Sequence, residues 1–301
     1  MHLLLGNPQD PCCVGVRDLL EARNYPTRIV ANPLVHPSRF SWRLDNHRSS
    51  SQLAWDDELP MPDDRIAGVL VRSIGWIDPA GWEKAGDLAY MQAETQAALL
   101  AWLWSLACPV VNRYPSALWY RPRVPLLSWQ GLLRRCGMPT LETLVTNVEA
   151  EARSFGRRLA REGVAGAVYG PFTGDLSYFV TDDKDWSGLA ALQQTAPVCL
   201  AYPHGAPQLV CVLGEEVVWE GEPAPEAAAL EPVLQCFAGA AGLALVELAL
   251  APTSQGVCVI AVEPHPNFGH FGAVARQRIV EGIVRLLTEE PKQHYPAKDR
   301  S

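Results

Sequence analysis

Along the N-terminal part of the chain, short continuous apolar runs alternate with a segment whose apolar residues have helical spacing. Short continuous apolar runs at 2–5 and 27–31 predict buried strands, and apolar residues at helical spacing over 14–23 predict a helix between them. Strand, helix and strand in this order are typical of the opening of a parallel α/β layer. The next stretch, 32–64, is rich in Pro, Ser, Asp and Trp without a clear period. It favours an irregular insertion or a small β element.

The alternation of strands and helices returns before residue 115. An apolar strand is predicted at 66–71, an Ala- and Leu-rich helix at 90–106, and a further strand at 109–112. Strands that are separated by a helix can pair in parallel, so we expect 66–71 and 109–112 to be parallel neighbours in one sheet. Together with the preceding elements they predict one α/β domain over 1–115.

The rest of the chain contains more predicted strands than helices. A Gly-containing turn separates the apolar runs at 208–213 and 216–219, which predicts a hairpin. We also expect 246–250 to pair antiparallel with 257–263, across a turn that contains Gly256. The other elements predicted here are strands at 143–147, 166–169, 176–181 and 198–202 and helices at 126–136, 148–162, 230–241 and 273–287.

Several stretches, taken in order, resemble the ATP-grasp superfamily. The sequence Asn112-Arg113-Tyr114-Pro115 leads into a helix that closes with Cys136-Gly137-Met138-Pro139, and a strand ending in Thr146-Asn147 follows. Later, Val259-Ile260-Ala261-Val262-Glu263-Pro264-His265-Pro266 resembles the strand and turn that present a metal-binding carboxylate in that superfamily. The hairpin over 208–219 is the third similarity. Residues 66–115 also look like the preceding domain of the subgroup that modifies peptides and ribosomal proteins.

The resemblance implies a fold and a division of the chain. The expected fold class is α/β, with an N-terminal pre-grasp-like parallel α/β domain followed by an ATP-grasp-like α+β domain. The implied boundaries are 1–115 for the first domain, 116–195 for the N-terminal subdomain of the second, and 196–301 for its C-terminal subdomain.

The nucleotide site that the resemblance implies is altered in this sequence. An ATP-grasp ligase phosphorylates a carboxylate with ATP, and positive side chains must hold the triphosphate. Relatives use two lysines, but Gly170 stands where the second is expected and the first helix offers none. Arg121 and Arg123 could substitute for the first lysine, because arginine holds phosphate through a two-pronged donor. Tyr169 and His204 are the further nucleotide-binding candidates, and for His204 an ordinary turn role is the alternative.

Magnesium binding is the second activity that the resemblance implies. Glu247 and Glu263 lie on adjacent predicted strands and offer the carboxylate oxygens that Mg²⁺ prefers. His265 stands where relatives carry Asn, and imidazole suits Mg²⁺ poorly. A set of Glu263, His265 and His270 could bind Zn²⁺ or Fe²⁺ instead, and a third interpretation is that these are loop residues near a site that has lost its function.

Two arginines near the expected domain junction are the catalytic candidates. Arg72 follows a predicted strand and Arg113 lies in the Asn-containing turn. Either could bind an acidic peptide or a substrate carboxylate, and ordinary ion pairing with surface acids is the alternative.

Composition narrows the classes of partner. The net charge of −8 and the pI of about 5.4 argue against nucleic acid or anionic lipid as the main ligand. The apolar run 97–111 is shorter than the ~20 residues of a membrane span, and the eight cysteines include no CxxC pair. We therefore expect a cytoplasmic protein with reduced cysteines. The ten tryptophans could form a contact surface, although core packing accounts for most of them.

Two functions from different classes remain. The first is an ATP- and Mg²⁺-dependent carboxylate–amine ligase that acts on peptides or amino acids. The second is a catalytically inactive pseudo-enzyme that binds a peptide or a partner protein, and it is motivated by the missing lysines. Either protein could form a homo-oligomer.

Overall fold

A computed structural model gives the fold. It describes residues 1–46, 48–55, 58–73, 77, 84–120, 124, 126–161, 167–171, 178–180, 183–193, 198–201, 206–253 and 256–289. These residues group into two compact units. The first contains Met1–Tyr120, Gly242–Leu245 and the segment that begins at Asn267, and the second contains Arg121–Ala241 and Val246–Pro266.

A parallel sheet forms the centre of the first unit. Its strands follow the order β2-β1-β6-β7, and every neighbouring pair is parallel. The pairing of β6 with β7 confirms the prediction that 66–71 and 109–112 are parallel neighbours. The strands are β1 (His2–Leu5), β2 (Thr27–Val30), β6 (Gly68–Val71) and β7 (Val110–Val111).

Local sequence explains where the first helix begins and ends. Helix α1 (Pro11–Ala22) is capped by Asp10, whose Oδ1 accepts a hydrogen bond from the backbone N–H of Cys12 at 2.9 Å, and proline occupies its first position. Just after the helix, Asn24 adopts a positive φ of 61°, a conformation that asparagine tolerates better than most residues. Helix α1 thus connects β1 to β2 within the parallel layer.

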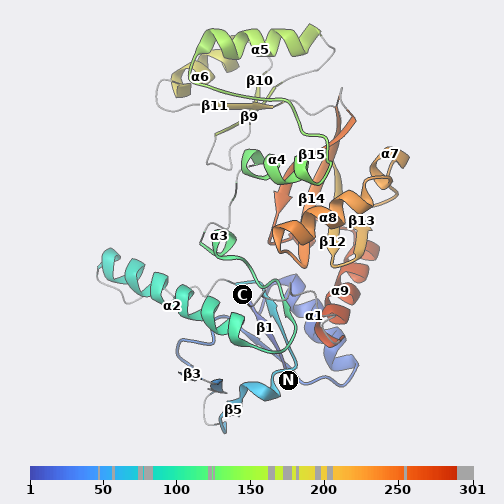
Figure 1. Ribbon diagram of the computed structural model, residues 1–301. Coiled ribbons are helices and arrows are strands. Elements are labelled where there is room, and N and C mark those ends of the chain that lie inside the picture. Colours follow the sequence, from blue (N-terminus) through green and yellow to red (C-terminus); the bar gives the residue numbers. More distant parts are fainter. Residues whose placement is uncertain are drawn as a thin grey trace, which may run out of the picture. The chain divides into compact units, whose positions relative to one another are not determined.

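The C-terminal helix returns to the first unit. Helix α9 (Ala273–Thr288) packs against α1 and contacts β6 and β7 (Figure 1). Its buried face includes Ile279 and Ile283, both with no exposed surface. The predicted helix is confirmed, but the expected assignment of 196–301 to one subdomain differs from this grouping, because the last helix lies with the N-terminal strands.

The stretch without a clear period forms a small antiparallel sheet in the first unit. Its strands are β3 (Ser38–Leu44), β4 (Ser49–Trp55) and β5 (Met61–Pro62), followed by a single 3₁₀ turn η1 (Asp63–Arg65). The Ser51 hydroxyl donates to Asp63 at 2.9 Å and accepts from the indole N–H of Trp102 at 2.9 Å. Trp102 belongs to α2 (Ala85–Ser105), so one buried hydroxyl joins this sheet to the long helix.

One antiparallel sheet of the second unit carries the predicted hairpins. Its order is β13-β12-β14-β15, and both predicted hairpins are confirmed by the pairing. Helices α4 and α8 contact each other through the rings of Trp129 and Phe237, whose centroids are 5.6 Å apart. The elements are β12 (Gln208–Leu213), β13 (Glu216–Trp219), β14 (Leu245–Thr253), β15 (Gly256–Glu263), α4 (Leu126–Arg135), α7 (Pro225–Ala228) and α8 (Glu231–Ala241).

A second antiparallel sheet of this unit has the order β10-β9-β11-β8. Strand β11 lies between β9 and β8, so the sheet extends across the boundary expected at residue 195. The elements are β8 (Thr143–Thr146), β9 (Ala167–Pro171), β10 (Tyr178–Val180), β11 (Val198–Ala201), α5 (Glu149–Arg161) and α6 (Asp183–Gln193); a short helix α3 (Ser116–Trp119) belongs to the first unit.

Most tryptophans that the structure describes serve the core. Trp55, Trp119 and Trp129, three of the ten tryptophans that could form a contact surface, are buried. Trp76 and Trp82 lie outside the described residues. No helix in the described part of the chain combines the length and the apolar character that crossing a bilayer requires.

Candidate functional site

The two candidate metal-binding carboxylates lie opposite each other on the β14–β15 hairpin. Glu247 and Glu263 are direct cross-strand partners in the antiparallel ladder. Directly opposed residues project from the same face of a sheet with Cβ atoms about 4.5–5.5 Å apart. Glu247 is buried and Glu263 is exposed. The hairpin therefore places the two carboxylates at neighbouring positions on one face of the sheet.

A β-bulge sets this register. The pairing shifts between Ala249 and Leu250: Leu250 faces Val259, whereas Ala249 faces Ala261, which leaves Ile260 as the extra residue. A ladder continued without this shift from the turn would place Val262 opposite Glu247. Bulges of this kind redirect side chains near functional sites, and here the bulge brings the second carboxylate into register.

The turn after β15 holds Glu263 in place. Oε1 of Glu263 accepts a hydrogen bond from the backbone N–H of His265 at 2.8 Å. Farther along, the Asn267 side chain accepts from the Gly269 N–H at 3.0 Å and lies 3.2 Å from Nε2 of His270. Across the described ranges, no three His, Cys, Asp or Glu side chains gather in an arrangement that could hold a metal ion. The alternative set of Glu263, His265 and His270 is thus not assembled.

The two candidate catalytic arginines, both in the first unit, differ in how their donors are used. Arg113 directs Nη2 to the carbonyl oxygens of Leu106 and Cys108, at 2.9 and 3.3 Å, and its guanidinium lies 5.6 Å from the ring centre of Trp104. These carbonyls lie just after the end of α2, so Arg113 stabilises the backbone that follows this helix. A role in catalysis remains a prediction for Arg113.

Arg72 is buried at the end of β6. Its Nε donates to Oδ2 of Asp10 at 2.9 Å, and only 10% of the side chain is exposed. Nη1 is also buried, and within the described part of the molecule it has no hydrogen-bond partner. Burial opposes the charged form, but Cys12 and the Asp10 carboxylate outweigh it and raise the pKa of the guanidinium above its ordinary value, so Arg72 stays positively charged.

Most of the candidate nucleotide-binding residues lie outside the part of the chain that the structure describes. Arg121, Arg123 and His204 lie outside the described residues. Tyr169 belongs to β9, opposite Tyr178 of β10 and Leu200 of β11, and its side chain lies outside the description. These four assignments stay predictions. Gly170 follows in the same strand, opposite Cys199.

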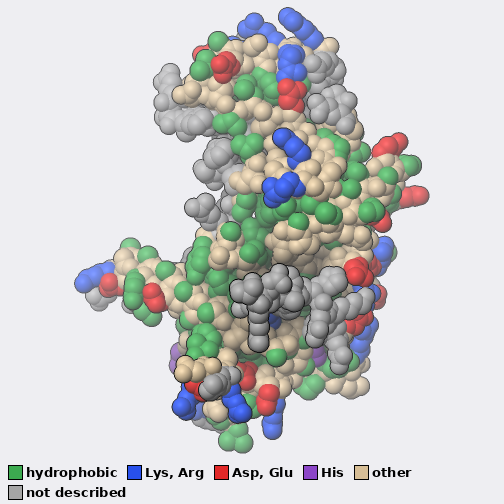
Figure 2. Space-filling model, in the orientation of Figure 1, with side chains coloured by type: hydrophobic (Ala, Val, Ile, Leu, Met, Phe, Trp, Pro, Cys, Tyr) green, Lys and Arg blue, Asp and Glu red, His purple; other side chains and the backbone are tan. Residues whose placement is uncertain are grey.

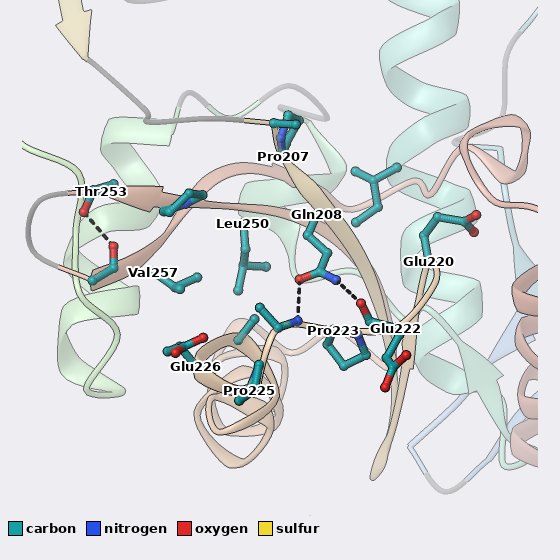
Figure 3. Close-up of a pocket in the computed structure, with 16 residues that line it drawn as sticks. Pro207, Gln208, Glu220, Glu222, Pro223, Pro225, Glu226, Leu250, Thr253 and Val257 are labelled. Carbon is teal, nitrogen blue, oxygen red and sulfur yellow. Dashed lines mark hydrogen bonds between the residues drawn. The ribbon is translucent and has the colours of Figure 1, made fainter. Parts of the chain in front are cut away.

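A cavity of about 970 Å³ lies elsewhere in the second unit, at one end of the β12–β15 sheet. Leu250 and Val257 line it from the two long strands, and the Gln208 side chain reaches across it (Figure 3). The Gln208 amide donates to the carbonyl of Glu222 at 2.9 Å and accepts from the Ala224 N–H at 3.4 Å, which ties the loop after β13 to β12. Apolar strands thus form the floor, and the loop and α7 form the wall.

The rim of this cavity is acidic. Glu220, Glu222 and Glu226 all line it. Figure 2 shows acidic side chains projecting from the molecule at the place where Figure 1 draws α7. An apolar floor with an acidic rim suits a peptide segment that carries apolar and basic side chains.

No family model and no curated protein matches the chain by sequence. Solved structures do match it over nearly its whole length. The macrocyclase MdnC of Microcystis aeruginosa MRC, bound with the precursor peptide MdnA, has a TM-score of 0.73 at 14% identity, over 95% of this chain and 98% of that one.

Two further solved structures match the chain over nearly its whole length. A Chryseobacterium gregarium RiPP-associated ATP-grasp ligase, in complex with ADP and a leader and core peptide, has a TM-score of 0.70 at 14% identity, over 95% of this chain and 96% of that one. The ATP-grasp ligase PsnB, complexed with a minimal precursor, Mg and ADP, has a TM-score of 0.71 at 17% identity, over 96% and 98%. The chain has the ATP-grasp ligase fold. The similarity drawn from the sequence is thereby confirmed for the fold, including its α/β class.

Within this ATP-grasp fold, sequence reasoning missed the cavity. The signal was present in the run Glu220-Gly221-Glu222-Pro223-Ala224-Pro225-Glu226, in which acidic residues alternate with Gly and Pro. Such a run predicts a rigid acidic loop. It does not predict that Leu250 and Val257, distant in the sequence, complete a pocket against it.

Proposed function

We propose that this protein is an ATP-dependent ligase that activates a carboxylate of a peptide substrate, with an altered nucleotide site and with Mg²⁺ held by Glu247 and Glu263. The observation that carries the proposal is the direct cross-strand pairing of these two carboxylates. The ATP-grasp fold supports it, as do neighbours solved with precursor peptides and with ADP.

The residues present fit a magnesium ion. Mg²⁺ in nucleotide sites is bound through one or two carboxylates, with phosphate oxygens and waters completing the octahedron. Two opposed glutamates meet this requirement without a third protein ligand. When bound, the ion would neutralise charge that develops on the transferred phosphoryl group. Glu263, oriented by the His265 N–H, would keep one carboxylate fixed while the ligand set forms.

The peptide would lie in the acidic-rimmed cavity. Its volume of about 970 Å³ accommodates a few side chains, and the apolar floor would bury them. Glu222 and Glu226 at the rim would attract basic residues of the peptide. A peptide substrate or a partner protein that presents such a segment is the partner class proposed.

Nucleotide-dependent metal binding tests the ligase proposal. Mn²⁺ replaces Mg²⁺ as the probe, and water-proton relaxation is followed with and without ADP. We expect ADP to strengthen Mn²⁺ binding in the unmodified protein, and Glu263→Gln and Glu247→Gln to weaken that binding about tenfold or more. Glu21→Gln, an exposed glutamate on α1, is the matched control and should leave it unchanged. The affinity for Mg-ATP separates the two candidates, because a dissociation constant near or above ~1 mM would favour the non-catalytic one and micromolar binding would favour the ligase.

The second candidate is a non-catalytic peptide-binding protein. It is favoured by Gly170 of β9, since the resemblance to ATP-grasp ligases implies a phosphate-binding lysine at this position. If ADP has no effect on Mn²⁺ binding by the unmodified protein, the ligase proposal is wrong and this candidate replaces it.

A further inference from the structure

The carboxyl ends of β1 and β6 form a switch point in the parallel sheet of the first unit. Strand β1 connects through α1 to β2 on one side of it, and β6 pairs with its other side. In open α/β sheets, ligands bind outside the carboxyl ends of strands at such points. Gly6 follows β1 and Arg72 follows β6, so both residues lie at this place.

Arg72 has a donor there that the described residues leave unused. The guanidinium is nine-tenths buried and is held from one side by Asp10 through Nε. Nη1 is shielded from solvent and has no hydrogen-bond partner among the described residues. A buried donor without an acceptor is destabilising, and native proteins rarely leave one without a partner or a bound water. An acceptor from a ligand would satisfy it.

The surroundings of Arg72 are closely packed and come from separate elements. A Cβ at Gly6 would lie 2.7 Å from Sγ of Cys13 and 3.0 Å from Cβ of Arg72, so glycine is required for this approach. The Phe268 ring centre lies 5.9 Å from the guanidinium. Burial raises the pKa of the Cys13 thiol to about 12, so this thiol adds no negative charge at neutral pH.

The N-terminus of α1 contributes further positive potential. Asp10 caps this twelve-residue helix, and its carboxylate contacts both the Cys12 N–H and Arg72. Unpaired N–H groups of a first helical turn favour anions. Because Asp10 already neutralises one unit of charge beside Arg72, the remaining potential suits a monoanion better than a phosphate dianion.

We propose that Arg72 and the N-terminus of α1 form a binding subsite for a carboxylate of the peptide substrate, with Nη1 of Arg72 donating to a carboxylate oxygen. This proposal rests on the proposed function for the identity of the substrate. Arginine provides planar, charge-assisted donors that match a carboxylate. Asp10 fixes the orientation of the guanidinium and leaves Nη1 to the ligand.

Calorimetric titration without nucleotide or metal tests this subsite. The probe is N-acetyl-glutamate α-amide, whose one free carboxyl group is the side chain, and N-acetyl-glutamine α-amide is the uncharged control. We expect saturable millimolar binding of the glutamate probe and none of the glutamine probe. Arg72→Lys keeps the charge beside Asp10 but loses the planar fork, and it should weaken binding about tenfold or more. Arg28→Lys is the matched control, since Arg28 pairs with Glu58 at 2.6 Å in the same unit.

Asp10→Asn provides a variant with the opposite expected effect. Asparagine also caps helices well, so α1 should persist, while the charge of Arg72 is no longer neutralised. Binding of the glutamate probe should tighten several-fold. If Arg72 and Asp10 form only a structural ion pair, this variant changes the urea midpoint of unfolding and leaves binding unchanged, and the proposal fails.

Three other results would overturn the proposal. These are no saturable binding by the unmodified protein, equal binding by Arg72→Lys, and tighter binding of inorganic phosphate than of the glutamate probe. Each is measured without ADP or Mn²⁺. Failure of the subsite therefore leaves the test of Glu247 and Glu263 intact, and failure of that test leaves this one interpretable.

Discussion

At the residue scale, Asn112 shows why one polar side chain can be essential to the core. The residue is 1% exposed. Nδ2 donates to the carbonyl of Leu245 at 2.7 Å, and Oδ1 accepts from the Leu245 N–H at 2.8 Å. Both backbone groups at the start of β14 are thereby satisfied at the end of β7. The sequence marked Asn112 as part of an ATP-grasp-like turn, and the structure supplies the physical reason for an amide there.

Replacing this amide should destabilise the protein. Asn112→Asp keeps the shape but cannot donate to the Leu245 carbonyl, so it leaves a buried acceptor beside a carboxylate. We expect a loss of about 2–4 kcal/mol in the free energy of unfolding, measured with urea. Asn46→Asp, exposed in the same unit, is the control and should change stability by about 0.5 kcal/mol or less. Equal stability of the two variants would contradict the assigned role of Asn112.

The candidate site could be predicted only in part at this scale. Glu247 and Glu263 follow from the resemblance to the ATP-grasp superfamily and from their places on adjacent predicted strands, and the register pairs them. Arg113 was selected for its charge and place in the turn, but that pattern cannot show that its donors reach the carbonyls of Leu106 and Cys108. The charge of a side chain makes it a candidate binding residue. Whether its hydrogen-bond donors are available to a ligand depends on tertiary contacts, which the sequence does not show.

At the scale of elements, the sequence predicted strand partners where a tight turn or a single helix joins the two strands. The hairpins β12–β13 and β14–β15 were predicted because a glycine turn joins two apolar runs, so partner and direction follow from proximity. Strand β11 is an equally apolar run, but its partners β8 and β9 are distant in sequence. Four apolar residues do not specify which edge they join.

Helix packing in the second unit gives a prediction at this scale. Trp129 of α4 is buried against the ring of Phe237 of α8. Trp129→Ala should cost about 3–5 kcal/mol, because it removes a large buried ring and leaves a cavity between the helices. Trp104→Ala, at a residue that is 48% exposed, should cost about 1 kcal/mol or less. Urea unfolding followed by circular dichroism compares the two, and a similar loss in both would show that the ring contact does not hold α4 to α8.

At the scale of the whole molecule, the chain crosses between the two units more than once. It leaves the first unit after Tyr120, returns briefly at Gly242–Leu245, and returns again at Asn267. The sequence predicted a helix at 273–287 and, from its position, a place in the last subdomain. Helical spacing defines the apolar face of α9 but not its partner, which is the sheet formed by the first residues of the chain.

This return makes the first unit dependent on the C-terminal helix. Ile283 has no exposed surface and lies on the α9 face that packs toward α1, β6 and β7. Ile283→Ala should cost about 2–5 kcal/mol, and hydrogen–deuterium exchange should show the loss of protection in β1 and β6, with little change in β12 and β15. Val274→Ala, at a residue in the first turn of α9 that is 79% exposed, is the control and should leave both regions protected. Equal loss of protection in both regions would mean that the two units unfold together. Loss confined to the first unit would instead establish that the N-terminal sheet and α9 fold as one cooperative structure, although nearly the whole chain separates them in sequence.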